Sequence, residues 1–138
     1  MAAVLAPERT LTQIDYVRLT RLLTHQQPPD RNAPALAELL ADSELVASPA
    51  IPPDVVTMYS QILVADEASG SRMDIVLCYP SDADPAAGFM SVLAPLGAAL
   101  LGLRVGDAAH WTAPGGEPHT VRILEMLFQP EATGDYTT

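Results

Sequence analysis

Two histidines near the end of the chain have the spacing that comes nearest to a metal site. His110 and His119 flank the turn in "HWTAPGGEPH", where Gly115 and Gly116 predict a β-hairpin that could bring the two rings together. A zinc site needs a third and a fourth ligand, and Glu117 is the only candidate nearby. We therefore expect ordinary strand histidines here and no bound metal.

Other reactive residue types lack the partners that catalysis requires. Ser91 lies in no nucleophile-elbow pattern, and the sequence places neither a histidine nor an acid beside it. The chain contains no lysine, which excludes the phosphate-binding loop whose lysine contacts a nucleotide. The single cysteine, Cys78, lies in an apolar run and is expected to be a buried hydrophobic residue. The chain is thus predicted to be no enzyme and to use no cofactor.

The composition is that of an acidic globular protein. The 138 residues carry 17 acids and seven bases, all of them arginine, for a formal charge of −10. Nucleic-acid binding needs a basic stripe that neutralises phosphates, so this charge argues against it. With 49% hydrophobic residues the chain can bury a core. Neither a signal peptide nor an apolar run long enough to span a membrane is found, which predicts a cytoplasmic protein.

The first third of the chain predicts two amphipathic helices, over 12–25 and 35–48. The prolines of "HQQPPDRNAP" separate them, because proline cannot continue a helix. We expect an antiparallel helical hairpin, a short coiled coil, in an N-terminal unit of residues 1–48. Helices of about 14 residues give an arm roughly 20 Å long.

The first predicted helix has a capping signal and one apolar face. Thr12 followed three residues later by Asp15 resembles a capping pair. Ile14, Val17 and Leu22, joined by neighbouring leucines, are expected on the face that packs inward.

Residues 49–138 are predicted to form a β-domain with one short helix, so the fold class is α+β. Pro95 can begin the helix and Gly102 can end it. The apolar residues around this helix, Leu96, Leu100, Leu101 and Val105, are expected in the core beneath it. Turns rich in glycine, aspartate, serine and proline separate the strands, which are expected at 58–66, 73–80, 88–95, 107–113 and 120–128.

The last predicted strand shows regular alternation. Its period of two places Val121, Ile123, Glu125 and Leu127 on one side, with the intervening residues on the other. The second side also holds apolar residues, so both faces are expected to be partly covered.

Several motifs of the β-region carry a family resemblance. The run "DADPAAGFMSVLAPLGAALLGLRVGD", followed by "TAPGG" and a closing strand, resembles the C-terminal domain of the bacterial Gre transcript-cleavage factors. The segments "PPDVVTM", "APLGAALLGLRVGDAAHW" and "FQPEATGDY" are similar to the regulators of nucleoside diphosphate kinase, a Gre-related group with a shortened arm. This second resemblance extends over nearly the whole chain.

The resemblance implies a fold, a partner and two sets of site residues. The domain is expected to be FK506-binding-protein-like and to bind RNA polymerase at the rim of the secondary channel, with the arm pointing into the channel. Family rim contacts carry over to Leu93, Ala94 and Pro95, although Gre factors often have an acid where Leu93 stands. Leu93 and Pro95 could equally serve the core. The arm tip falls on Pro28, Pro29, Asp30 and Arg31.

The tip sequence departs from the pattern that transcript cleavage requires. Gre-type cleavage uses two acids a turn apart at the tip to hold a Mg²⁺ ion, whereas this tip has only Asp30, followed by Arg31. The arm also looks about half as long as in Gre factors. We therefore expect a non-enzymatic regulator that competes with Gre-type factors for polymerase and stimulates no cleavage. The acids of the arm, Glu38, Asp42 and Glu44, could face a basic channel wall or simply be solvated.

Two other functions stay open. The chain could be a protein-binding module that regulates nucleoside diphosphate kinase, with polymerase binding incidental. A prolyl isomerase is disfavoured, because such a pocket is lined by several aromatic residues and this chain has only two phenylalanines, four tyrosines and one tryptophan, widely spaced.

Overall fold

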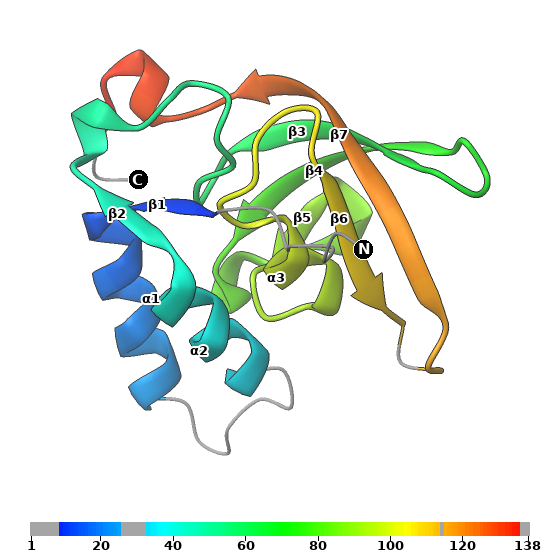
Figure 1. Cartoon of the computed structure of the whole chain (residues 1–138), viewed down its shortest axis with the longest axis horizontal. Coiled ribbons are helices and arrows are strands. Elements are labelled where there is room, and N and C mark those ends of the chain that lie inside the picture. Colours follow the sequence, from blue (N-terminus) through cyan, green and yellow to red (C-terminus); the bar gives the residue numbers. More distant parts are fainter. Residues whose placement is uncertain (1–8, 26–32, 114, 136–138) are drawn as a thin grey trace, which may run out of the picture.

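The computed structural model describes residues 9–25, 33–113 and 115–135 of the chain. It is a mixed α+β structure in which two helices lie beside a curled sheet, as Figure 1 shows. Within this part of the chain no helix has the length and apolar character needed to cross a membrane.

The two longer helices precede most of the strands, as expected, but a short strand that was not predicted comes before the first helix. Short 3-10 turns connect some of them. The helices are α1 (Gln13–His25), α2 (Ala33–Asp42) and α3 (Pro95–Leu100), and the strands are β1 (Thr10–Thr12), β2 (Glu44–Val46), β3 (Gln61–Asp66), β4 (Arg72–Cys78), β5 (Phe89–Ser91), β6 (Ala108–Thr112) and β7 (Pro118–Phe128).

The larger sheet has five strands in the order β5-β4-β3-β7-β6. All its neighbours are antiparallel except β4 and β5, which run parallel. The sheet curls around α3, whose residues Leu96 and Leu100 lie in the core (Figure 1). Leu101 is also in the core and Val105 packs against it, which confirms the predicted role of these four residues.

The regular alternation predicted for the last strand is wrong beyond Ile123. Register shifts between β3 and β7 pair Val64 with Ile123, Leu63 with Glu125 and Ile62 with Met126. Such bulges move the following side chains to the opposite face. Glu125 is therefore exposed, and Met126 packs against the core instead.

The second predicted helix ends earlier than expected. It stops at Asp42, and residues 44–46 form β2, which pairs in parallel with β1. The backbone N–H of Glu44 also donates to the Arg9 carbonyl over 2.9 Å. This two-stranded sheet joins the bases of α1 and α2, so the helices leave from a common anchor.

The capping pair of the first helix is confirmed, and its predicted apolar face is right for Leu19, Leu22 and Leu23 but wrong for Ile14 and Val17. The Asp15 N–H donates to Thr12 Oγ1 over 3.0 Å, as a capping residue requires. The buried face is built around Leu19, whereas Ile14 and Val17 are exposed. A helix that packs on only one side leaves some of its apolar residues without cover.

One continuous core contains residues of both halves of the chain. Leu11, Leu19, Leu36 and Leu40 of the N-terminal elements pack in the same cluster as the sheet and α3. The Thr10 N–H donates to the Gly102 carbonyl over 3.0 Å, across the junction. The predicted division into residues 1–48 and 49–138 stays a prediction.

Gly97 allows α3 to approach the end of β5. A Cβ atom at this position would lie 2.1 Å from the Ser91 carbonyl oxygen and 3.1 Å from its carbon. Both atoms belong to the backbone, so neither can turn away as a side chain would. Only glycine is compatible with this distance between α3 and β5.

Replacing Gly97 by alanine is expected to destabilise the fold, because α3 must move away from Ser91. Overpacking of this kind costs about 1–3 kcal/mol, and a backbone clash belongs at the upper end. Urea denaturation of Gly97→Ala measures the loss. Gly115→Ala is the matched control, since nothing lies within 4 Å of a Cβ there. Equal stability of the two variants would contradict the packing described.

Candidate functional site

The turn from β5 into α3 presents two of the three residues predicted to bind a partner. The Ser91 Oγ accepts a hydrogen bond from the Leu93 N–H, and the Ser91 carbonyl accepts one from the Ala94 N–H, both at 3.0 Å. Leu93 is 4% exposed and lies in the core, whereas Ala94 and Pro95 are half-buried at the surface. Ala94 and Pro95 are thus the residues of this turn that a partner can reach, and their role stays a prediction.

An apolar groove opens on one side of this turn. It encloses about 570 Å³, and its walls come from β4, β5 and the loop between them. Asp74 is the one charged residue in the lining, so the groove fits apolar side chains of a partner. Its lining residues are Met73, Asp74, Ile75, Ala83, Pro85, Ala86, Gly88, Phe89, Met90, Ser91 and Ala94.

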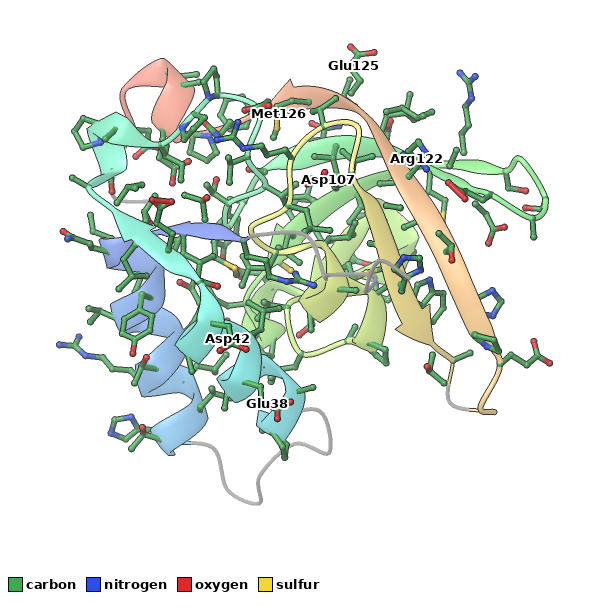
Figure 2. The ribbon with its side chains drawn as sticks, in the orientation of Figure 1. Glu38, Asp42, Asp107, Arg122, Glu125 and Met126 are labelled. Carbon is green, nitrogen blue, oxygen red and sulfur yellow. The ribbon has the colours of Figure 1, made fainter. Side chains whose placement is uncertain are left out.

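An acidic cleft lies on the other side of the turn, between α2 and α3. It encloses about 320 Å³ and is lined by Pro95, His110 and the two acids of α2 that lie one turn apart, Glu38 and Asp42, among others. Figure 2 shows both carboxylates on α2, exposed to solvent. The turn therefore separates an apolar hollow from an acidic one.

Arg9 lines the acidic cleft but its charge is directed at backbone carbonyls. Its Nη1 donates to the carbonyls of Ala98, Ala99 and Leu101 over 3.3, 3.0 and 2.7 Å. These groups end α3, where carbonyls lack helical partners and favour a cation. Burial lowers the pKa of Arg9, and the nearby Asp107 carboxylate opposes that shift. Arg9 therefore fixes α3 to the N-terminal strand.

A buried carboxyl group lies where α1 meets the β-domain. Asp15 is 2% exposed, and its Oδ2 accepts a hydrogen bond from the Met58 N–H over 3.1 Å. Burial raises the pKa of Asp15 to about 7, and the nearby Glu131 adds to the rise, while hydrogen bonds and Arg18 oppose it. Glu131 in turn accepts from Thr57 Oγ1 over 2.7 Å. The sequence identified Asp15 only as a capping residue and gave no signal of this burial.

The histidines of the β6–β7 hairpin lie on opposite faces of the sheet. His110 pairs with Thr120, while His119 pairs with Trp111 and stacks on its ring at 4.8 Å. Neighbouring residues of a strand point to opposite sides, so the two imidazoles cannot share a ligand. Among the described residues, no three His, Cys, Asp or Glu side chains are placed to hold a metal ion.

Two further predictions concern Cys78 and the arm tip. Cys78 is fully buried, as expected. The tip residues Pro28, Pro29, Asp30 and Arg31 lie outside the described residues, so their role stays a prediction.

Known proteins resemble this chain over most of its length. The family model "Transcription elongation factor, GreA/GreB, C-term" matches residues 51–127. The regulator of nucleoside diphosphate kinase of Escherichia coli is 38% identical over 94% of this chain and 96% of that protein. The transcription elongation factor GreA of Christiangramia forsetii is 30% identical over 59% of this chain and 51% of its own.

A solved structure extends the resemblance to the fold. It is described as the prokaryotic transcription elongation factor GreA/GreB from Nitrosomonas europaea, and it is 37% identical. The TM-score is 0.73 over 89% of this chain and all of that one. The resemblance to this group stated from the sequence is confirmed.

The buried carboxyl of Asp15 makes stability depend on pH. Because its pKa is higher in the folded chain than in the unfolded one, folding takes up a proton, and stability is lost as pH rises from about 4 through about 7. A shift from 3.8 to about 7 corresponds to roughly 4 kcal/mol. Asp15→Asn stays neutral and keeps an oxygen for the Met58 N–H, so it should gain stability over the wild type across this range.

Chemical denaturation at pH 4.5 and pH 8 measures this difference between the two proteins. Asp42→Asn removes an exposed carboxyl from α2 and should follow the wild-type profile. A pH profile of Asp15→Asn that is parallel to the wild type would rule out a raised pKa at Asp15.

Proposed function

The chain belongs to the GreA/GreB family of transcription elongation factors, and we propose that it binds RNA polymerase at the rim of the secondary channel. In this proposal it competes with Gre-type factors for that site and does not stimulate transcript cleavage. The observation that supports it most directly is the match of residues 51–127 to the GreA/GreB C-terminal domain. That segment contains the turn at Ala94 and Pro95 to which the family's rim contacts carry over.

The surroundings of that turn have the chemistry of a protein interface. The apolar groove can receive side chains of a rim helix, because interface centres are depleted in charge. The acidic cleft, with Glu38 and Asp42 on its edge, can steer a basic partner toward the groove. Leu93 contributes by holding the turn from within the core.

The length of the arm supports competition without cleavage. The 13 residues of α1 give a reach of roughly 20 Å. Of the residues between the helices, 26–32, only Asp30 is acidic, so the two-acid pattern that holds Mg²⁺ in Gre-type cleavage is missing. The proposal also includes two features of the fold: the two helices form a coiled-coil arm, and the β-domain is FK506-binding-protein-like.

A second candidate function is regulation of nucleoside diphosphate kinase through direct binding. The observation that favours it is the name of the relative that is 38% identical over 94% of this chain. Immobilised protein incubated separately with purified polymerase and purified kinase distinguishes the two. Retention of the kinase alone would favour this second function.

Ala94→Arg is expected to weaken binding to polymerase at least tenfold. The long charged side chain would occupy the groove and exclude the apolar side chains of the partner from a lining whose one charged residue is Asp74. Displacement of a fluorescently labelled Gre factor from polymerase measures the effect. The matched control is Ala68→Arg, which adds the same charge at an exposed turn between β3 and β4. If both variants displaced the labelled Gre factor equally well, the groove would not be part of the surface that binds polymerase.

The wild-type chain should leave backtracked transcripts at full length. Without paired tip acids it cannot hold the second Mg²⁺ ion that the cleavage reaction needs. Transcript length on gels, with a Gre factor as positive control, gives the answer. Mg²⁺-dependent shortening by the purified chain would contradict the proposed mechanism.

A further inference from the structure

The outer face of α1 exposes apolar side chains that the rest of the described chain does not cover. Ile14 is 37% exposed and Val17 is 47% exposed. With Gln13, Arg18 and Arg21 they line a shallow hollow of about 300 Å³. Positions 14, 17, 18 and 21 follow the spacing of one helix face, so these side chains form a continuous surface, which we call the α1 face.

The α1 face is basic, although the chain as a whole is strongly acidic. Asp15 is the only acid in α1, and it is 2% exposed, so its carboxyl does not lie on the exposed surface. Arg21 and His25 are exposed, and Arg18 is half-buried beside them. Among the described residues Arg122 pairs with Glu67 over 2.8 Å, whereas Arg21 forms no ion pair. The α1 face therefore carries two arginines, although the net charge of the whole chain is −10.

We propose that the α1 face binds an acidic amphipathic helix of a protein partner. The backbone groups within a helix are already hydrogen-bonded to one another, so side chains alone must make the contact. Ile14 and Val17 would pack against apolar residues of the partner, and Arg21 would pair with a flanking carboxylate. Gln13 to Arg21 spans roughly 12 Å, which is the length of two turns of a partner helix.

The same features disfavour nucleic acids and membranes as the occupant. Phosphates would leave Ile14 and Val17 without apolar contacts, and a charge of −10 repels a polyanion at long range. An anionic lipid surface meets the same repulsion, and two arginines supply only weak attraction. A short acidic helix carries less charge and offers apolar groups.

The proposal does not depend on polymerase binding. The α1 face is formed by residues 13–21, while the apolar groove is formed by residues 73–94, and no residue lines both. Variants of one surface therefore leave the other unchanged. Failure of either proposal can be recognised separately.

A charge-reversal experiment with two synthetic helical peptides tests the inference. Both have leucine at helix-face spacing, and the flanking residues are glutamate in one and lysine in the other. The full-length chain should bind the glutamate peptide roughly tenfold more tightly, as measured by fluorescence anisotropy at low salt. Arg21→Glu should reverse this preference, and Val17→Asn, which removes the apolar contact without adding charge, should weaken binding of both peptides.

Arg72→Glu is the matched control, because it reverses an exposed arginine on β4, outside the α1 face. It should retain the wild-type preference. Thermal unfolding verifies that each variant is folded, which the exposure of Arg21 and Val17 leads us to expect. The proposal is overturned if Arg21→Glu retains the wild-type preference, if neither peptide binds, or if vesicles of anionic lipid bind to the α1 face instead.

Discussion

The contact between Gly97 and the carbonyl group of Ser91 determines how α3 lies within the curled sheet. This contact involves only backbone atoms, so it fixes the separation of α3 and β5 more strictly than side-chain packing would. The turn that carries Ala94 and Pro95 connects these two elements. Its position, and the groove on one side of it, therefore follow from the absence of a single methyl group.

A second backbone constraint joins the helices to the β-domain. Gly102 has a φ of +80°, and a Cβ there would lie 3.1 Å from Arg9 Cβ and 3.2 Å from the Thr10 carbonyl oxygen. With the three carbonyls that accept from Arg9, it brings β1 against the end of α3. α2 leads into β2, which pairs with β1, and the acidic cleft lies between α2 and α3. The two hollows beside the turn at Ala94 and Pro95 thus depend on Gly97 within α3 and on Gly102 just after it.

Local signals in the sequence predicted most of the helices and strands. The features that the sequence did not predict depend on contacts between residues far apart in the chain. Prolines and glycines marked α3, and Thr12 marked the start of α1. Residues 44–46 continue a helical period, but pairing with β1, more than thirty residues away, makes them a strand. For the site, family resemblance indicated the turn at Ala94 and Pro95. The apolar groove could not be predicted, because its walls come from three segments that only the fold brings together.

The parallel pairing of β1 with β2 has a consequence for how proteins of this architecture can diversify. α1 begins at this small sheet and α2 ends at it, so β1 and β2 hold the base of both helices (Figure 1). Adding whole helical turns in equal number to α1 and α2 would lengthen both helices without disturbing this base. The length of the two helices and their attachment to the β-domain can therefore change independently. Related proteins can have longer or shorter helices on the same β-domain.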